Sequence, residues 1–380
     1  MYIVNKLNKV LPVALMLLVL FGSCSSEEKI GDGEDWLFVG AMGSMDYIEF
    51  EASLSKMEGD VNALESSMPD RFTLYGFNSA LGFSMFGSTS STTAQGVDVT
   101  RNTADSARWD YVDSKTQSKL KWGTFLKYPV SFYAIGGEGA CHAKIGALNK
   151  LPLLQVNLPV GTDGTVRSEE THDLLFAQAL RLYPLKYQTD SLKVALDFKH
   201  ILPLVNLRAS LADANDLEVT VRSATLMGLV SAAELDFNSF NPHWGIHTSG
   251  KEAAKADIVL ALEKPVTLGA ESAALQDCGA YIVPQTVRAW TTAAQKDGAG
   301  VKLDARVRSK ATGTYLVGSE SSYGQVYVPI DNMTFASNTA YTFDITFNVI
   351  YDSNGSMGFR ASWKPVVTPW VEKDDNLVYE

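Results

Sequence analysis

The chain has 380 residues, 46% of them hydrophobic and 20% charged, so it holds enough apolar material to bury a substantial core. Its 43 acidic residues outnumber its 32 basic residues, and the net charge of −11 argues against nucleic acid and anionic lipid headgroups as partners. From length alone we expect two domains.

The first 23 residues have the composition of a lipoprotein signal peptide. Lys6 and Lys9 give it a cationic start, and an apolar run follows over residues 10–21. Such a run covers roughly 18 Å as a helix, too short for a bilayer core of about 30 Å. Two small residues then precede Cys24, so we expect cleavage before Cys24 and attachment of acyl chains to it. A plain secretory signal is the alternative.

Apolar and polar residues alternate along much of the remaining chain, which predicts β-strands. The first alternating segment has its apolar positions at Ile48, Phe50, Ala52 and Leu54. A longer one runs over residues 341–351, and turn-forming sequences separate such segments. Few helical patterns intervene, which favours antiparallel β-sandwiches over a parallel α/β sheet. We expect helix only in two insertions, at 168–180 and 250–255.

Two cysteines, Cys141 and Cys278, follow Cys24. A disulfide between them is compatible with an exported protein, whereas their apolar surroundings and wide separation favour two buried free thiols. The sequence leaves both alternatives open.

Residues suited to catalysis or metal binding are sparse. The five histidines are scattered, and His243 and His247, although four residues apart, flank a Trp-Gly pair in what we expect to be a loop. The sequence has no nucleophile elbow, phosphate loop or paired-cysteine zinc motif. We therefore expect no enzymatic activity, no metal and no cofactor. A glycosidase with paired carboxylates that meet only in the fold is the minor alternative.

Several segments, taken in order, resemble the fimbrillins of Bacteroidia. They are Asp-Phe-Lys-His-Ile-Leu at 197–202, the strand 217–226, Glu-Leu-Asp-Phe at 234–237, Tyr-Ile-Val-Pro-Gln-Thr at 281–286, Val-Tyr-Val-Pro-Ile at 326–330 and the strand 341–347. The resemblance implies an all-β fold of two tandem transthyretin-like antiparallel β-sandwich domains behind a lipoprotein signal peptide. The expected division is a signal peptide at 1–23, a lipidated tether at 24–40, an N-terminal domain at 41–190 and a C-terminal domain at 191–380.

The resemblance also implies a role as a structural subunit of a type V pilus, or fimbrium, on the bacterial outer membrane. Its partners would be other copies of itself or related pilus subunits, and its lipid would attach it to the membrane. The alternative is a lipid-anchored surface adhesin or glycan-binding protein, at the pilus tip or as an accessory subunit, with a host glycan or protein as ligand. The sequence does not distinguish stalk, tip and anchor subunits.

In the polymerising fimbrillins a protease removes the N-terminal strand, and a strand from a neighbouring subunit's C-terminus fills the groove. In this chain the removable strand carries Ile48, Phe50, Ala52 and Leu54. The resemblance implies a donor strand from residues 362–380, with the side chains of Val366, Val367, Trp370 and Val371 for insertion. Such a contact is head-to-tail and builds fibres. The alternative is a tail that packs on its own domain.

Subunits cleaved by an arginine-specific protease have an arginine shortly after the first strand. This chain has Lys56 there, and its first arginine is Arg71. Lys56 and Arg71 are therefore the candidate processing sites, and an uncleaved, lipid-anchored accessory subunit is a third outcome. The segments Asp-Ser-Ala and Asp-Ser-Leu around Ser106 and Ser191 resemble the O-glycosylation sequon of the same bacteria, which makes both serines candidate modification sites.

Overall fold

The computed structural model describes residues 48–54, 70–78, 96–104, 109–111, 129–137, 144–145, 153–183, 193–236, 243–245, 254–289 and 298–369. Within these ranges the chain is almost entirely β-strand, and its helical content is one 3-10 turn at Ser168–Glu170. The expected all-β class is therefore confirmed. No helix in the described ranges is long and apolar enough to cross a membrane. The signal peptide 1–23, Cys24 and the tether 24–40 fall outside these ranges.

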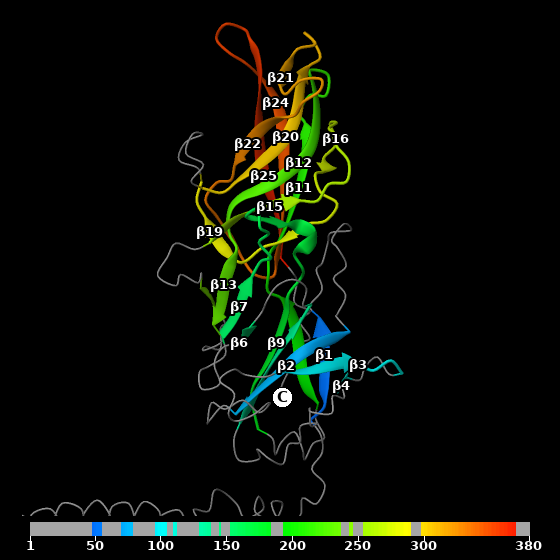
Figure 1. The fold of residues 1–380 in the computed structure, drawn as a ribbon, viewed down its shortest axis with the longest axis vertical. Coiled ribbons are helices and arrows are strands. Elements are labelled where there is room, and N and C mark those ends of the chain that lie inside the picture. The colour runs from blue at the N-terminus through cyan, green and yellow to red at the C-terminus, as the bar shows by residue number, and fades with distance from the viewer. Residues whose placement is uncertain are drawn as a thin grey trace, which may run out of the picture. The chain divides into compact units, whose positions relative to one another are not determined.

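The N-terminal strands form a seven-stranded sheet, called here the β1 sheet (Figure 1). Its order is β1 (Phe50–Leu54), β10 (Val194–His200), β9 (Leu175–Leu182), β5 (Val130–Gly136), β2 (Arg71–Asn78), β3 (Val97–Arg101) and β4 (Trp109–Tyr111). Neighbouring strands are antiparallel except β1 and β10, which are parallel. The sheet is curled, since β1 and β4 stand at opposite ends of the order and yet contact each other.

The concave side of the β1 sheet encloses a cluster of buried side chains, called here the inner core, to which every strand of the sheet contributes. Aromatic rings join distant parts of it. The ring centroid of Phe72 lies 5.0 Å from that of Trp109 on β4 and 5.2 Å from that of Phe198 on β10. Because the contributing strands include both ends of the sheet, the inner core is complete only when the end strands are in place.

The central strands of the β1 sheet are also buried on their other face. On β5, Phe132 and Ala134 belong to the inner core, whereas Tyr133 and Ile135 belong to a second, larger cluster, called here the main core. Burial raises the pKa of Tyr133 to about 12, although a hydrogen bond with Ser131 acts in the opposite direction. These strands therefore separate two hydrophobic cores.

Strand β9 corrects one expectation. The sequence predicts a helix at 168–180, but beyond the 3-10 turn this segment leads into a β-strand. Leu175 and Ala177 enter the inner core, whereas Leu174 and Phe176 enter the main core. A strand buried on both faces has no apolar and polar alternation, so its sequence is easily read as a helix. The helix prediction was wrong for this reason.

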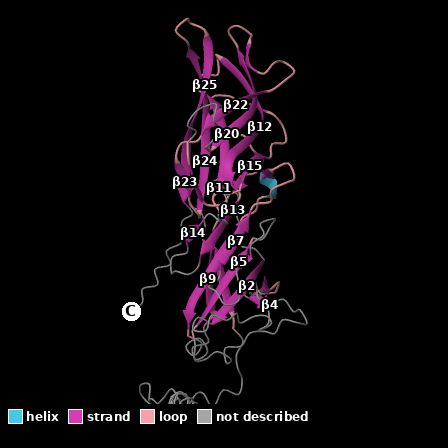
Figure 2. Ribbon diagram, turned by 60° about the vertical axis from the view of Figure 1, so that its left-hand side comes forward, coloured by secondary structure: helices cyan, strands magenta, loops and turns pink. Residues whose placement is uncertain are grey.

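Two further sheets pack across the main core, called here the β12 sheet and the β24 sheet. The β12 sheet has the order β21 (Tyr315–Val317), β20 (Gly300–Ser309), β12 (Leu217–Val230), β15 (Lys255–Leu260) and β8 (Thr165–Arg167), with β16 (Val266–Thr267) beside β12 and β22 (Gly324–Pro329) beside β20. The β24 sheet has the order β17 (Ala273–Ala274), β11 (Leu204–Leu211), β24 (Thr339–Tyr351) and β25 (Met357–Pro369), with β18 (Ala280–Tyr281) beside β11. The long strands of both sheets run in similar directions, as in an aligned sandwich (Figure 2).

Two small sheets complete the described structure. One has the order β14 (His243–Gly245), β13 (Ala232–Asp236), β7 (Leu153–Asn157) and β6 (Lys144–Ile145), and the other pairs β19 (Gln285–Val287) with β23 (Met333–Phe335). His243 therefore lies in a strand, and the predicted loop at this position was wrong. The helix expected at 250–255 is not formed at its described end, because Lys255 is already the first residue of β15.

A short connection joins the β1 sheet to the β24 sheet, since residues 201–203 alone separate β10 from β11. His200, at the end of β10, is buried, and its Nδ1 lies 2.7 Å from Oδ2 of Asp173. Nearby, the backbone N–H of Tyr281 on β18 donates a hydrogen bond of 3.0 Å to Oγ1 of Thr171. Burial, with a further contribution from the negative charge of Asp173, raises the pKa of Tyr281. Polar contacts thus fix the chain where the two sheets meet.

The expected division between residues 190 and 191 assigns β10 to the C-terminal domain. In the structure β10 pairs with β1 and β9 in the β1 sheet. The division into two transthyretin-like domains stays a prediction. The mainly antiparallel arrangement includes three parallel pairs among the described strands, β1 with β10, β11 with β24 and β8 with β15.

Candidate functional site

Strand β1 holds its place by pairing with β10 along its whole length. The register runs in parallel from Phe50 opposite Val194 to Leu54 opposite Phe198. Just before β1, the carbonyl oxygen of Glu49 accepts a hydrogen bond of 2.8 Å from the backbone N–H of Val194. β1 is thus a five-residue end strand with β10 as its hydrogen-bonded neighbour.

The apolar side chains of the β1 segment point into the inner core. Ile48 and Phe50 are 1% and 2% exposed, and Ala52 and Leu54 pack against the same core half-buried. The ring of Phe50 meets that of Phe132 edge to face, with centroids 5.3 Å apart and planes at 87°. The alternation in the sequence therefore places all four apolar positions on the core face.

The polar side chains of β1 lie on the opposite, solvent side, where Ser53 donates a hydrogen bond to the carboxylate of Asp197 on β10. Because β1 also contacts β4, it stands where the two ends of the curled sheet meet. The sequence contained both alternating segments, β1 and β10, but it held no signal for their parallel pairing, since 144 positions separate residues such as Phe50 and Val194.

Strand β25 contains the first part of the expected donor segment. It pairs antiparallel with β24 over thirteen residues, from Met357 opposite Tyr351 to Pro369 opposite Thr339. The turn between them is closed by Asp352, whose Oδ1 accepts hydrogen bonds of 2.8 Å from the backbone N–H groups of Asn354 and Ser356. The described end of the tail is therefore paired with its own chain.

The two halves of β25 differ in burial. In the first half, Phe359 and Trp363 pack on the main core, and Nε1 of Trp363 donates a hydrogen bond of 2.7 Å to the carbonyl oxygen of Pro329. In the second half, Val366 and Val367 are 50% and 51% exposed although the backbone is still paired. Trp370 and Val371, the other two expected donor residues, lie outside the described residues.

The two candidate processing residues differ in what the structure describes. Arg71 is the first residue of β2, pairs with Thr100 on β3 and forms an ion pair with Asp98. The next residue, Phe72, is 1% exposed in the inner core, so cleavage after Arg71 requires Phe72 to leave that core. Lys56 lies outside the described residues.

The remaining predicted sites fall mostly outside the described ranges, as do Ser106, Ser191 and Cys141. Cys278 is half-buried, with its Sγ 3.5 Å from Oγ of Ser168. The disulfide alternative is therefore untested. Within the described ranges, histidine, cysteine and acidic side chains form no cluster suited to a metal ion.

Comparison with known proteins defines the class of this protein. The sequence pattern of the family described as fimbrillin-like matches residues 77–370, which is most of the chain. The protein therefore belongs to the fimbrillin-like family. No curated protein matches the sequence.

Similar solved structures come from Bacteroides and Porphyromonas species. A fimbrial protein from Bacteroides vulgatus superposes with a TM-score of 0.54 at 13% identity, covering 85% of this chain and 99% of its own. A candidate cell adhesion protein from Bacteroides ovatus has a TM-score of 0.42 at 14% identity, with 87% and 100% covered. A tip fimbrial protein from Porphyromonas gingivalis has a TM-score of 0.34 at 9% identity, with 86% and 100% covered. At these identities the first of them supports the shared fold.

Proposed function

We propose that the protein is a structural subunit of a cell-surface pilus, exported as a lipoprotein through Cys24 and assembled by strand exchange after removal of β1. Its partners are then other copies of itself or related pilus subunits, and its site of action is the bacterial outer membrane and the fimbrium. Membership of the fimbrillin-like family supports the pilus assignment. The observation that carries strand exchange is the combination of a short, parallel end strand with deeply buried side chains.

The physical argument starts from what the loss of β1 would leave behind. The edge of β10 would lose its backbone partners, and the inner core would lose the side chains of Ile48 and Phe50. Unpaired backbone groups and exposed apolar surface are both unfavourable in water, and an added strand with apolar side chains at alternate positions satisfies both. Such a strand would lie between β10 and β4, where β1 lies now.

The C-terminal tail is the proposed source of that strand. Val366 and Val367 already expose apolar side chains, and Trp370 and Val371 follow them in the sequence. Pro365 and Pro369 lack backbone N–H groups, which limits this segment to edge pairing. Donation of Val366 and Val367 requires the end of β25 to separate from β24, since both residues are paired there.

We further propose Lys56, rather than Arg71, as the processing site. A protease acting after Arg71 must open the start of β2 and withdraw Phe72 from the inner core. Lys56, in contrast, comes two positions after the last residue of β1 in the sequence and precedes β2. N-terminal sequencing of pili sheared from cells should give a chain that starts at Met57. A start at Phe72 would assign processing to Arg71 instead. Intact, acylated Cys24 in every fraction would contradict processing altogether and favour the lipid-anchored adhesin.

Filament formation tests strand exchange directly. Two recombinant forms are compared, residues 25–380 with β1 and residues 57–380 without it. We expect filaments and SDS-resistant ladders from the shorter form, and monomers from the longer one. A third form, residues 57–369, serves as the matched control and should not form filaments because it lacks the end of the tail.

A form without β1 can fail to fold, so a second route starts from the folded protein. Folded 25–380 is cleaved with a lysine-specific protease, and a peptide of residues 48–54 is added in excess to some samples. Cleaved protein should assemble, and the peptide should suppress assembly because it refills the site beside β10. A cleaved, folded protein that stays monomeric at high concentration would contradict the proposal.

A further inference from the structure

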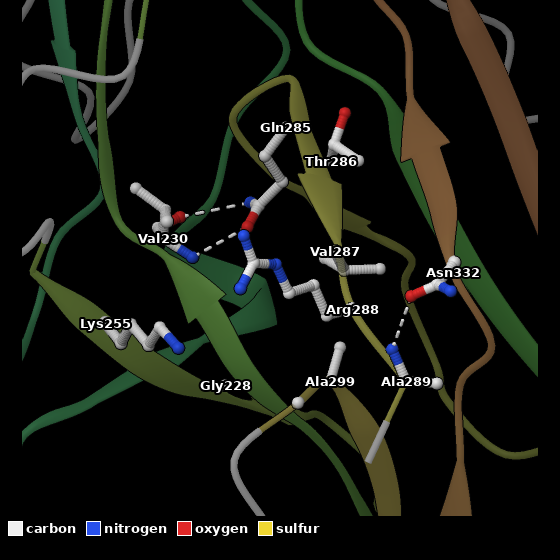
Figure 3. A pocket seen from close by; sticks show the side chains of 11 residues that line it. Gly228, Val230, Lys255, Gln285, Thr286, Val287, Arg288, Ala289, Ala299 and Asn332 are labelled. Carbon is white, nitrogen blue, oxygen red and sulfur yellow. Dashed lines mark hydrogen bonds between the residues drawn. The ribbon is translucent and has the colours of Figure 1, made fainter. Parts of the chain in front are cut away.

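A pocket of about 540 Å³ lies at the end of β12 (Figure 3). It is bordered by the end of β12, the start of β15, strand β19, the segment just before β20 and the segment before β23. A volume of a few hundred Å³ is typical of sites for small molecules.

Two glycines allow the backbone around this pocket to approach closely. Gly228 has a φ of +72°, and a Cβ added there would lie 2.7 Å from the carbonyl oxygen of Gly298. A Cβ on Gly298 would lie 2.3 Å from the carbonyl oxygen of Arg288. Gly228 also falls where the register of β12 against β15 shifts, so β12 bulges at the pocket. The concavity is therefore built into the backbone.

The polar wall of the pocket is held by internal hydrogen bonds. Gln285 is 6% exposed, and its Oε1 accepts a hydrogen bond of 2.8 Å from the N–H of Val230. Its Nε2 donates to the carbonyl oxygens of Val230 and Val283 at 3.2 and 3.0 Å. Opposite it, Oδ1 of Asn332 accepts a hydrogen bond of 2.9 Å from the N–H of Ala289. These hydrogen bonds fix the side chains of the polar wall in place before any ligand binds.

Two cationic side chains reach this pocket from different elements. In Figure 3, Arg288 turns back toward Gln285 and Val230, while the amine of Lys255 extends toward the same space from the other side. Among the described residues, neither cation forms an ion pair. Asp257 is the adjacent acidic residue, and its Oδ1 accepts a hydrogen bond of 3.1 Å from the N–H of Gly228. Two cations thus border the pocket of a chain whose net charge is −11.

We propose that this pocket binds a carboxylate-bearing sugar, such as the uronic or sialic acid unit of a glycan. The guanidinium of Arg288 matches a carboxylate in geometry, because its two N–H groups form a fork that can pair with both oxygens. The small apolar side chains of Val230, Val287 and Ala299, together with the amide of Asn332, suit a sugar ring, which has both apolar and hydroxyl-bearing faces. The site does not depend on strand exchange.

Calorimetric titration of residues 25–380 tests the proposal with glucuronate, galacturonate and N-acetylneuraminate as probes. A ligand of this size is expected to bind with a dissociation constant of about 1 mM. The methyl esters of the same sugars serve as uncharged controls and should bind at least tenfold more weakly. Inorganic phosphate, inorganic sulfate and an acidic peptide of residues 372–380 are the competing probes.

Charge-removing variants connect binding to the pocket. Arg288→Gln and Lys255→Gln should each weaken binding of the acidic sugar by at least tenfold. Arg360→Gln, on the exposed side of β25, is the matched control for loss of one positive charge and should leave binding unchanged. Thermal unfolding of each variant checks that the fold is intact, which is expected because both pocket cations are exposed.

Several results would overturn the assignment. One is the absence of sugar binding at concentrations up to 20-fold above about 1 mM. The others are equal affinity for the acid and its methyl ester, and an equal loss of affinity in the Arg360→Gln control. Tighter binding of phosphate or sulfate would make this a site for inorganic anions. Tighter binding of the peptide 372–380 would assign the pocket to contact between subunits.

Discussion

Strands β1 and β25 are both end strands of their sheets, yet they are held in different ways. β1 has five residues and a parallel partner, and its segment buries Ile48 and Phe50 to 1% and 2% exposure. β25 has thirteen residues and an antiparallel partner, but Val366 and Val367 near its end are about half exposed. Side-chain burial is therefore the main interaction that holds β1 in place. For the end of β25 the main interaction is backbone pairing. A strand held by burial in a slot is open to replacement by another strand with similar side chains.

The largest expected effect is at the buried contact of β1. Phe50→Ala removes the ring that packs on Phe132 and should lower the free energy of unfolding by about 3–5 kcal/mol. Denaturant unfolding of residues 25–380 measures it. Leu54→Ala, at the half-buried end of the same strand, is the control and should cost less than about 2 kcal/mol. Equal losses of unfolding free energy in the two variants would contradict the interpretation that β1 is anchored mainly at its start.

Alkaline pH should act on the main core rather than on β1. The pKa of Tyr133 is about 12 in the folded protein and about 10 when unfolded. Its contribution to the free energy of unfolding is therefore complete below pH 10 and disappears as the pH rises to about 12. At about 1.4 kcal/mol per pKa unit, the loss is roughly 2–3 kcal/mol. Tyr133→Phe should reduce the pH dependence of unfolding in this window, with the remainder due to Tyr281, whose pKa is also raised.

One control accompanies the alkaline titration. Phe50→Ala should lower stability at every pH without changing the slope above pH 10, because it removes no titrating group. A changed slope in that variant would show that β1 and the main core are coupled.

A smaller effect is expected in the packed half of β25. Trp363→Phe keeps most of the contact with Phe343, whose ring centroid is 4.9 Å away, but loses the hydrogen bond to Pro329. The expected cost is about 0.5–1.5 kcal/mol in urea unfolding. Lys364→Gln, at the next and exposed position, should be neutral, and a cost equal to that of Trp363→Phe would argue against a specific role for the indole.

The smallest effect on stability is expected at the end of β25. The double variant Val366→Thr, Val367→Thr keeps the backbone pairing and should change the free energy of unfolding by less than about 0.5 kcal/mol. If the tail donates a strand, the same variant should still reduce the yield of SDS-resistant ladders. Phe359→Thr, in the packed half, should destabilise the monomer instead. A stable double variant that assembles normally would remove these valines from the donor segment.

Strands with one solvent-exposed face could be predicted from the sequence. The alternation at residues 48–54 and 341–351 corresponds to β1 and β24, because each has a core side and a polar side. β9 could not be predicted in this way, since Leu174 to Ala177 are buried in two different cores and carry no polar positions.

The pairing of strands that lie far apart in the sequence also could not be predicted from the sequence. Nothing local in Val194 or Phe198 indicates that β1 pairs with them, because this pairing depends on the closure of the whole sheet. The pocket was missed for the same reason. Lys255, Arg288 and Asn332 come from separate elements, and the isolated glycines Gly228 and Gly298 gave the one available signal of close backbone approach.

The three-residue connection between β10 and β11 has a mechanical consequence for a fibre. In the proposed fibre, the strand at the position of β1 would pull on β10. β10 continues through residues 201–203 into β11, which pairs in parallel with β24. β24 in turn holds β25, the strand that leads to the tail. Tension along a chain of subunits would therefore run through three rows of backbone hydrogen bonds and one short covalent link, loading the strands lengthwise in shear. The contact of His200 with Asp173 lies at that link, where the load passes from one sheet to the other.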